Sequence, residues 1–443
     1  MISGFKFRSL KLKRVWVKNG GLALDATLLL DMTVVLWLCN AFLRKVVAKA
    51  LLVIHLHQYL SLLTTAIIYL PFLLYIAISK KIPFKYFQCF FLACAVFFGF
   101  TLLLHPSYLH WYTRESFGAV DVVFRPERGA IWAFLMVEIC GDAKRLWKNF
   151  QWASVGLFVY NMLLWLEAKR AGYWEYVGSD GRVTERSYSL EFGYSMAFVL
   201  FIVFLTYMVE KKRWQLLFSI LLVILILDSG SRGSLLALVL FGFIFFIDAK
   251  WSRQDKLRNF LLLGGIGGLA LLSVNQIVLL LVKLLKRYNI SSRTLTMLVS
   301  GDAIDDNGRD KIQALALKEI KENSLFGYGA FGDRQFIGPY YNWGYSHSIV
   351  YEMWVDFGVV LGTLFLTAAI LITAKIILSE KDPFIRGCVV VVVCVAVRLA
   401  VSNTFWGDPY YWMLIALLTK WMFVYRKRSR YMSAAKLYQK LNT

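Results

Sequence analysis

Apolar segments of membrane-spanning length recur along the chain and alternate with short polar stretches. A transmembrane helix needs about 20 consecutive, mostly apolar residues. The pattern predicts an all-α polytopic membrane protein with about twelve transmembrane helices. Eleven segments reach or approach the required length and a twelfth, at 127–141, is weaker: 22–42, 58–78, 86–104, 127–141, 151–168, 190–209, 214–228, 234–249, 259–282, 349–378, 387–404 and 409–425.

Basic residues are distributed so that they orient these spans. The first 20 residues carry six Lys or Arg and no acid, and the tail after residue 425 is also basic. Because cytoplasmic loops are enriched in Lys and Arg, both termini are predicted to lie in the cytoplasm. The basic loops fall on one side of the membrane only if the weak segment at 127–141 is counted as a span. Short basic loops fall on the same predicted side, at 80–85, 144–148, 211–213 and 250–258.

One long polar stretch, at 283–346, is predicted to be an extracytoplasmic loop. Apolar residues within it recur at helical spacing and indicate an amphipathic helix: Ile312, Leu315, Ala316 and Ile320. The chain is therefore divided into transmembrane helices 1 to 9, the long loop, and the C-terminal transmembrane helices with a basic tail, at 1–282, 283–346 and 347–443.

Composition supports a membrane protein without a large soluble domain. Hydrophobic residues make up 58% of the chain, against about 45–50% in soluble domains. Charged residues make up 18%, and 50 Lys and Arg against 28 Asp and Glu give a net charge of +22. Part of this charge orients the spans, and the rest suits an anionic ligand. We expect a lipid bilayer as partner and no nucleic acid.

Arg232 and Ser231 lie in a turn between two apolar spans, where residues 228–234 read D-S-G-S-R-G-S. An ionisable residue at membrane depth is by default a functional candidate. The small neighbours leave backbone N–H groups open to an anion at the start of the next helix. The alternative is an arginine that reaches the headgroups and only anchors the hairpin.

Arg309 is expected in the first turn of the amphipathic helix in the long loop. A cation is unfavourable beside the positive end of a helix dipole, unless an anion such as phosphate is held by both. The alternative is a solvated arginine that pairs with Asp310.

His347 stands where the long loop meets the next apolar segment. Its ordinary pKa near 6.5 suits it to accept a proton from a hydroxyl group. The alternative is an interfacial histidine bonded to backbone. No second His, Cys or acid lies at ligand spacing, so no metal site is expected. Tyr345 belongs to an aromatic group that either stacks on sugar rings or forms an interfacial belt.

Two further arginines, Arg398 and Arg125, are at the predicted depth to line a phosphate site. Most other charges within the apolar segments, such as Asp31, are expected to pair internally. The pattern G-x-G-x-x-G at 327–332 follows a helical segment and opens no βαβ unit, so it is interpreted as a turn.

These residues occur in an order that resembles the O-antigen polymerase and O-antigen ligase superfamily over about residues 215–378. The ordered features are Ser231-Arg-Gly233, Gly308-Arg309, Leu325-Phe-Gly-Tyr-Gly329, His347 and Tyr351 to Gly358. The resemblance implies a GT-C-like membrane glycosyltransferase that uses undecaprenyl-diphosphate-linked glycans without a metal ion or other cofactor. It also implies the bacterial inner membrane, with the active site facing the periplasm or cell exterior.

Residue by residue, Arg232 and Arg309 match the arginines that family members use to hold the lipid diphosphate, and His347 matches the catalytic base. Ser348 stands where many relatives have asparagine. The favoured activity is a polymerase that joins lipid-linked repeat units of O-antigen, capsule or exopolysaccharide by inverting transfer to a glycan acceptor. The alternatives are a ligase that transfers the glycan to lipid A core and, more distantly, a twelve-span transporter or lipid flippase. A partner that regulates chain length stays open.

Overall fold

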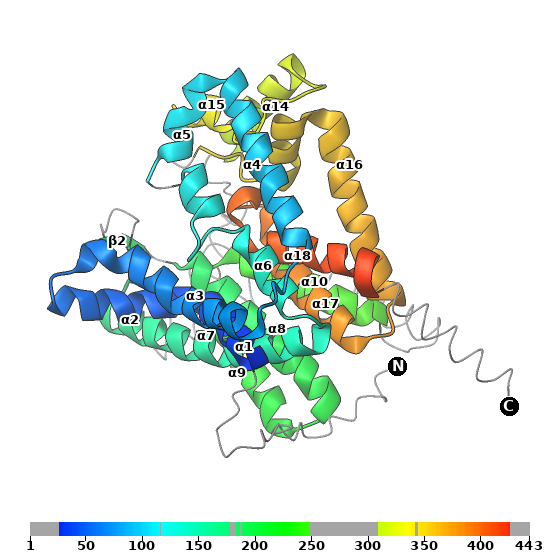
Figure 1. Cartoon of the computed structure of the whole chain (residues 1–443). Coiled ribbons are helices and arrows are strands. Elements are labelled where there is room, and N and C mark those ends of the chain that lie inside the picture. Colours follow the sequence, from blue (N-terminus) through cyan, green and yellow to red (C-terminus); the bar gives the residue numbers. More distant parts are fainter. Residues whose placement is uncertain are drawn as a thin grey trace, which may run out of the picture. The chain divides into compact units, whose positions relative to one another are not determined.

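The computed structural model describes residues 26–115, 117–177, 183–186, 188–248, 309–341 and 344–425, which are almost wholly helical (Figure 1). The predicted span at 259–282, the start of the long loop and the basic tail lie outside these residues. The described residues fall into two compact units. The first consists of the described residues within Phe150–Leu315 and Cys394–Ser402, and the second of those within Val15–Asn149, Ala316–Val393 and Asn403–Thr443.

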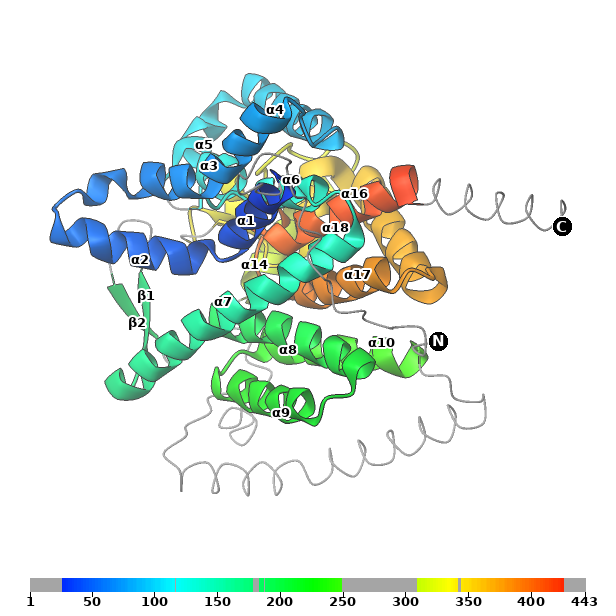
Figure 2. The same cartoon turned by 60° about the horizontal axis from the view of Figure 1, so that its bottom comes forward.

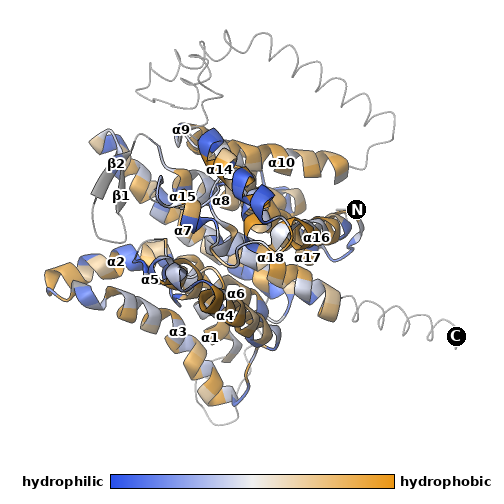
Figure 3. Cartoon of the chain, turned by 90° about the horizontal axis from the view of Figure 1, so that it is seen from above, coloured by the Kyte–Doolittle hydropathy of each residue, from blue (hydrophilic) through white to orange (hydrophobic). Residues whose placement is uncertain are grey.

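Five helical segments in the described part of the chain are long and apolar enough to cross a membrane. They are α3 (Leu60–Ser79), α4 (Tyr86–Leu104), α8 (Leu190–Glu210), α16 (Ile349–Ser379) and Pro383–Ala400, which joins α17 (Pro383–Ala396) to η5 (Val397–Ala400). Helices α1 (Ala26–Leu38) and α2 (Asn40–Val53) form a further candidate, bent by 79°. Figure 3 shows the hydrophobic residues along α16. The prediction of a helical polytopic membrane protein is confirmed, whereas the number twelve stays a prediction.

The weak span and its neighbour differ from their predicted bounds. Helix α6 (Trp132–Ile139) has eight residues, or about 12 Å of length, which is too short to cross a bilayer alone. Helix α7 (Ala143–Ala171) begins before the predicted span and includes its basic flank. Asp142 explains this start, because its Oδ1 accepts the Arg145 N–H at 2.8 Å. The Arg145 side chain, in the first turn of α7, forms an ion pair with Asp31 at 2.7 Å. This pair confirms the internal pairing that was expected of Asp31.

In the second unit, α1 and α2 pack against α3, and α6 packs against α18 (Pro409–Lys420). Buried polar groups close the helix ends. Glu138 accepts the backbone N–H groups of Tyr86 and Phe87 at 2.7 Å each, at the start of α4. Lys420 donates to the carbonyl of Val137 at 3.1 Å. Each charge is thus placed where it complements a helix dipole. The shorter elements of this unit are η1 (His57–Tyr59), η2 (Pro106–Tyr108), α5 (Leu109–Thr113), η3 (Val120–Phe124), α15 (Arg334–Ile337), η6 (Phe405–Gly407) and η7 (Trp421–Tyr425).

In the first unit, α8 packs against α9 (Arg213–Asp228) and α10 (Arg232–Asp248), and Figure 2 shows α9 alongside α8. An antiparallel ribbon pairs β1 (Trp174–Val177) with β2 (Val183–Arg186). The sequence pattern treated this region as a loop between spans. The ribbon therefore corrects the all-α prediction locally, within a fold that is otherwise helical.

Helix α16, predicted as one continuous span, contains a break at Gly358, where φ is 78° and ψ is 162°. The break leaves backbone carbonyls open to the glycine-containing segment at 327–332. Tyr328 donates its N–H to the Val355 carbonyl at 2.7 Å, and Gly329 donates to the Asp356 carbonyl at 3.1 Å. The segment interpreted as a turn is thus bound along α16 by its backbone.

The break depends on the missing side chain of Gly358. A Cβ atom there would lie 2.0 Å from the Leu325 carbonyl oxygen, and a positive φ strains other residues by about 1–3 kcal/mol. We predict that Gly358→Ala lowers the midpoint of thermal unfolding by at least several degrees. Gly99→Ala is the control, because a Cβ at Gly99 meets nothing within 4 Å. Equal midpoints for the two variants would contradict the packing described.

Candidate functional site

His347 lies one residue before the N-cap of α16, is half-buried, and has a backbone φ of 55°. A left-handed conformation is unfavourable for a residue with a Cβ atom, and it persists where surrounding contacts enforce it. Such residues are enriched at functional sites. The backbone conformation of His347 is therefore a second reason, besides its position in the sequence, to treat this residue as a functional candidate.

A buried ionic cluster lies next to His347 in the second unit. We call it the Arg334 cluster; it consists of Asp333, Arg334, Ser346, Glu352 and Thr404, none of which is more than 5% exposed. Arg334 bonds the carboxylates of Asp333 and Glu352, with an Nη1 to Oε1 distance of 2.9 Å to Glu352. Its Nη2 donates to the Thr404 hydroxyl at 3.0 Å.

The cluster is connected to His347 through aromatic rings. The guanidinium of Arg334 lies over Phe331 at 4.1 Å and over Tyr345 at 5.5 Å. The Tyr345 ring lies 4.3 Å from the imidazole of His347. Burial alone lowers the pKa of Arg334, but the carboxylates of Asp333 and Glu352 outweigh it and hold that pKa above its ordinary value. The guanidinium therefore stays charged.

The sequence reasoning missed this cluster. Glu352 was a detectable signal, because it is a carboxylate inside a strongly apolar segment. Its partner was not detectable, since Arg334 is 18 residues away and no periodic pattern relates the two.

In the first unit, the turn at 229–234, here called the serine turn, joins α9 to α10. Ser231 Oγ accepts the N–H of Ser234 at 3.3 Å, and the Ser229 hydroxyl oxygen accepts the N–H of Ser231 at 3.2 Å. Ser231 is 1% exposed. Its described contacts thus cap α10. Two of the N–H groups that were expected to be open to an anion, those of Ser231 and Ser234, are therefore bonded within the turn.

Helix α8 lies directly against the serine turn. A Cβ atom on Gly193 would lie 2.8 Å from the Ser231 Cβ, and one on Gly233 would lie 1.8 Å from the Tyr194 hydroxyl. The guanidinium of Arg398 lies 5.2 Å from the centre of the same Tyr194 ring. Arg398 and the serine turn are therefore brought to one tyrosine, at the point where α10 begins with Arg232.

Arg309 is the first residue of α14 (Arg309–Glu322), as predicted, and is half-buried. The expected apolar face is also present, because Ile312, Ala316 and Ile320 are buried. Ala316 and Ile320 pack with Val355 of α16.

Arg125 does not join His347 in the described contacts. It forms an ion pair with Asp121 at 2.9 Å, and Arg128 pairs with the same carboxylate. Burial raises the pKa of Asp121, although Arg128 and Arg125 favour its charged form. Arg125 is thus part of an ionic group of its own.

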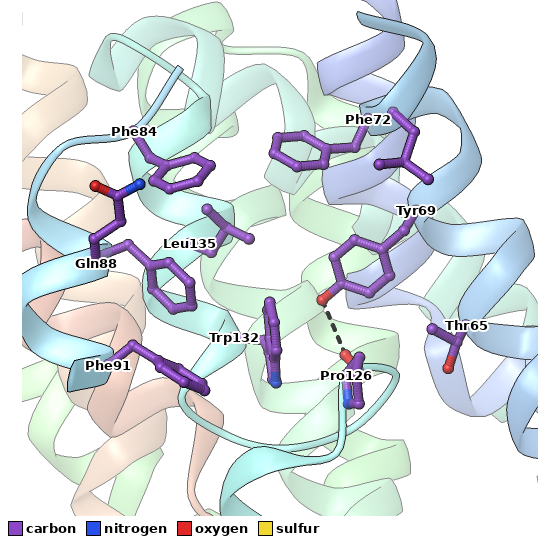
Figure 4. A pocket seen from close by; sticks show the side chains of 11 residues that line it. Thr65, Tyr69, Phe72, Phe84, Gln88, Phe91, Pro126, Trp132 and Leu135 are labelled. Carbon is purple, nitrogen blue, oxygen red and sulfur yellow. Dashed lines mark hydrogen bonds between the residues drawn. The ribbon is translucent and has the colours of Figure 1, made fainter. Parts of the chain in front are cut away.

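A pocket of about 530 Å³ lies between α3, α4 and α6 in the second unit. Figure 4 shows its aromatic lining and the bond of 3.0 Å from the Tyr69 hydroxyl to the Pro126 carbonyl. None of the predicted site residues lines it. The lining is Thr65, Tyr69, Phe72, Leu73, Phe84, Phe87, Gln88, Phe91, Pro126, Trp132 and Leu135. It suits hydrocarbon better than phosphate.

The structure thus brings Tyr345 to His347 and Arg398 to the serine turn. Arg232 and Arg309 belong to the first unit, and His347 belongs to the second. Within the described ranges, no group of three or more His, Cys, Asp or Glu side chains is placed to hold a metal ion.

These features define a helical membrane protein with a constrained histidine beside a candidate span. Residues 216–366 match the family model of O-antigen ligase, which confirms the resemblance to the O-antigen polymerase and ligase superfamily in this segment. The matched segment contains Arg232, Arg309 and His347, whereas Arg125 and Arg398 lie outside it. A search of curated proteins finds no match to the chain.

The close contact between α8 and the serine turn predicts a stability effect. Gly193→Ala should lower the midpoint of thermal unfolding, because its Cβ would lie within 2.9 Å of three serine side chains and overpacking typically costs about 1–3 kcal/mol. Gly242→Ala in α10 is the matched control, since a Cβ there meets nothing within 4 Å. A midpoint for Gly193→Ala as high as that of Gly242→Ala would contradict the close packing of α8 against the serine turn.

Proposed function

We propose that this protein is a polysaccharide polymerase that joins undecaprenyl-diphosphate-linked repeat units by inverting glycosyl transfer. The observation that carries the proposal is the family match over residues 216–366, which includes both arginines and the histidine that were chosen on chemical grounds. The positive φ of His347 supports a functional role for this residue.

In the proposed reaction, His347 removes the proton from a hydroxyl group of the acceptor sugar. The hydroxyl oxygen attacks C1 of the donor sugar, and the bond between C1 and the diphosphate oxygen breaks. Undecaprenyl diphosphate leaves with the bonding electrons, and the proton stays on the imidazole. A positioned base typically contributes about 10² to 10⁴-fold in rate.

The leaving diphosphate gains negative charge as the bond breaks. Fixed cationic groups stabilise such charge strongly, because they need little reorganisation. Arg232 and Arg309 are proposed to hold the diphosphate, and a guanidinium suits this task through bidentate bonds to phosphate oxygens. Arg398 and Arg125 are proposed secondary ligands, with Ser231 supporting the turn.

The proposal retains twelve spans, the weak one being α6 together with the turns on either side of it at 127–141. It also retains cytoplasmic termini, the boundaries at 282 and 346, and catalysis on the extracytoplasmic face of the inner membrane. Positive loops support this orientation. A C-terminal tag accessible to protease from the periplasmic side would contradict it.

A second candidate is a ligase that transfers the lipid-linked glycan to lipid A core. It is favoured by the description of the matching family as O-antigen ligase. Both reactions use the same donor and the same three residues. Analysis of the product separates them: lipid-linked chains of many repeats indicate a polymerase, whereas glycan attached to lipid A indicates a ligase.

We predict that His347→Ala, Arg232→Ala and Arg309→Ala each abolish chain extension while the protein accumulates in the membrane. Arg309→Lys should restore little activity, because an ammonium group lacks the planar fork of a guanidinium. Arg213→Ala is the control, since Arg213 begins α9 as Arg232 begins α10. Full activity of His347→Ala would remove the proposed base.

Purified protein incubated with a defined lipid-linked repeat unit is expected to extend it equally well with and without a chelator. The physical reason is that two guanidinium groups supply the charge that a divalent ion supplies elsewhere. Activity that is lost in chelator and regained with added magnesium or manganese would overturn the metal-independent mechanism.

A further inference from the structure

We infer that the Arg334 cluster positions His347 for proton transfer, so that Arg334, Asp333 and Glu352 are positioning residues of the proposed site. The inference rests on the proposed role of His347. It adds residues that contact neither sugar nor diphosphate in that proposal.

The first contact holds the backbone immediately before His347. Asp333 Oδ2 accepts the N–H of Ser346 at 3.0 Å, and Ser346 is fully buried. The hydroxyl of Ser346 in turn donates to the Ser348 carbonyl at 3.3 Å. The backbone is therefore held by hydrogen bonds on both sides of His347, and these bonds explain how its positive φ is maintained.

The second contact fixes the helix that follows. Glu352 lies in the first turn of α16, and it bonds both Arg334 and the hydroxyl of Thr404. Its other oxygen accepts the N–H of Phe405 at 2.9 Å. The start of α16 is thereby joined to the segment before α18.

The third contact acts on the imidazole itself. Arg334 lies over the Tyr345 ring, and the Tyr345 ring packs on His347 at an interplanar angle of 48°. The Tyr345 ring thus contacts both the guanidinium of Arg334 and the imidazole of His347.

The energetics favour a positioning role over simple stabilisation. One guanidinium bonds two buried carboxyl groups in this site. Buried ion pairs are often no more stabilising than apolar side chains of the same volume. Their distinct property is directionality, because the planar guanidinium bonds Asp333, Glu352 and Thr404 in fixed directions. Lysine would keep the charge and lose those directions.

The test uses the full-length protein purified in detergent, with Arg334→Lys as the main variant. We expect kcat to fall by about 10 to 100-fold with KM nearly unchanged, because misplacement by about 1 Å costs this much. A second readout is the ¹⁵N spectrum of protein labelled at histidine, in which the His347 signals are assigned by their loss in His347→Gln. These signals should shift in Arg334→Lys.

Arg145→Lys is the matched control. Arg145 also pairs with a partly buried carboxylate, Asp31, but its described contacts involve α1 and the turn before α7. It should leave both kcat and the His347 signals as in the original protein. Tyr345→Leu is the second variant. It removes the intervening ring without changing any charge, and it decides the question if Arg334→Lys fails to accumulate.

The outcomes separate the two proposals. A lower kcat with shifted His347 signals in Arg334→Lys or Tyr345→Leu supports positioning. Original kcat and unshifted signals in the variants that fold overturn it, even if His347→Gln is inactive. Full activity of His347→Gln overturns the proposed function instead, while the spectra still report whether the cluster holds the imidazole.

Discussion

The contact on which most of the local structure depends is the buried bond of Arg334 to Asp333 and Glu352. Buried charged groups are stable only when each has partners, since removal of one leaves the others unpaired at a large cost in free energy. The requirement joins three segments that are remote in sequence: Asp333-Arg334, the stretch from Ser346 to Glu352, and Thr404-Phe405. His347 lies inside the second of these segments, and its unusual backbone conformation follows from being held on both sides.

Small residues provide a second means of bringing segments together. Gly358 lets the chain at Leu325 approach α16, and Gly193 lets α8 lie against the serine turn. In both places backbone or hydroxyl groups of one segment occupy the space that a Cβ atom would fill. Such contacts place Arg232 at a defined helix start and fix the loop that precedes His347. They also explain why segments whose sequences contain several glycines are closely packed.

Sequence periodicity predicted the long apolar helices well. Helix α4 has the predicted bounds, and α8 differs by one residue, because uninterrupted apolar runs leave few alternatives. The break at Gly358 and the pairing of Arg145 with Asp31 at the start of α7 were not predictable, since each depends on a partner distant in sequence. Distance in sequence also explains which candidate site residues could be proposed from the sequence and which could not. Position and residue type were enough to propose His347 and Arg309, whereas the Arg334 cluster depends on three segments that are remote in sequence.

The central claim is direct displacement of a lipid diphosphate by an acceptor hydroxyl that His347 activates. The most direct measurement is the anomeric configuration of the newly formed linkage, determined by NMR on the product of a single transfer from a donor of known configuration. A single displacement inverts the configuration at C1, so the account predicts that an α-linked donor gives a β-linkage. Retention of configuration would exclude a single inverting displacement at C1, and it would contradict the account.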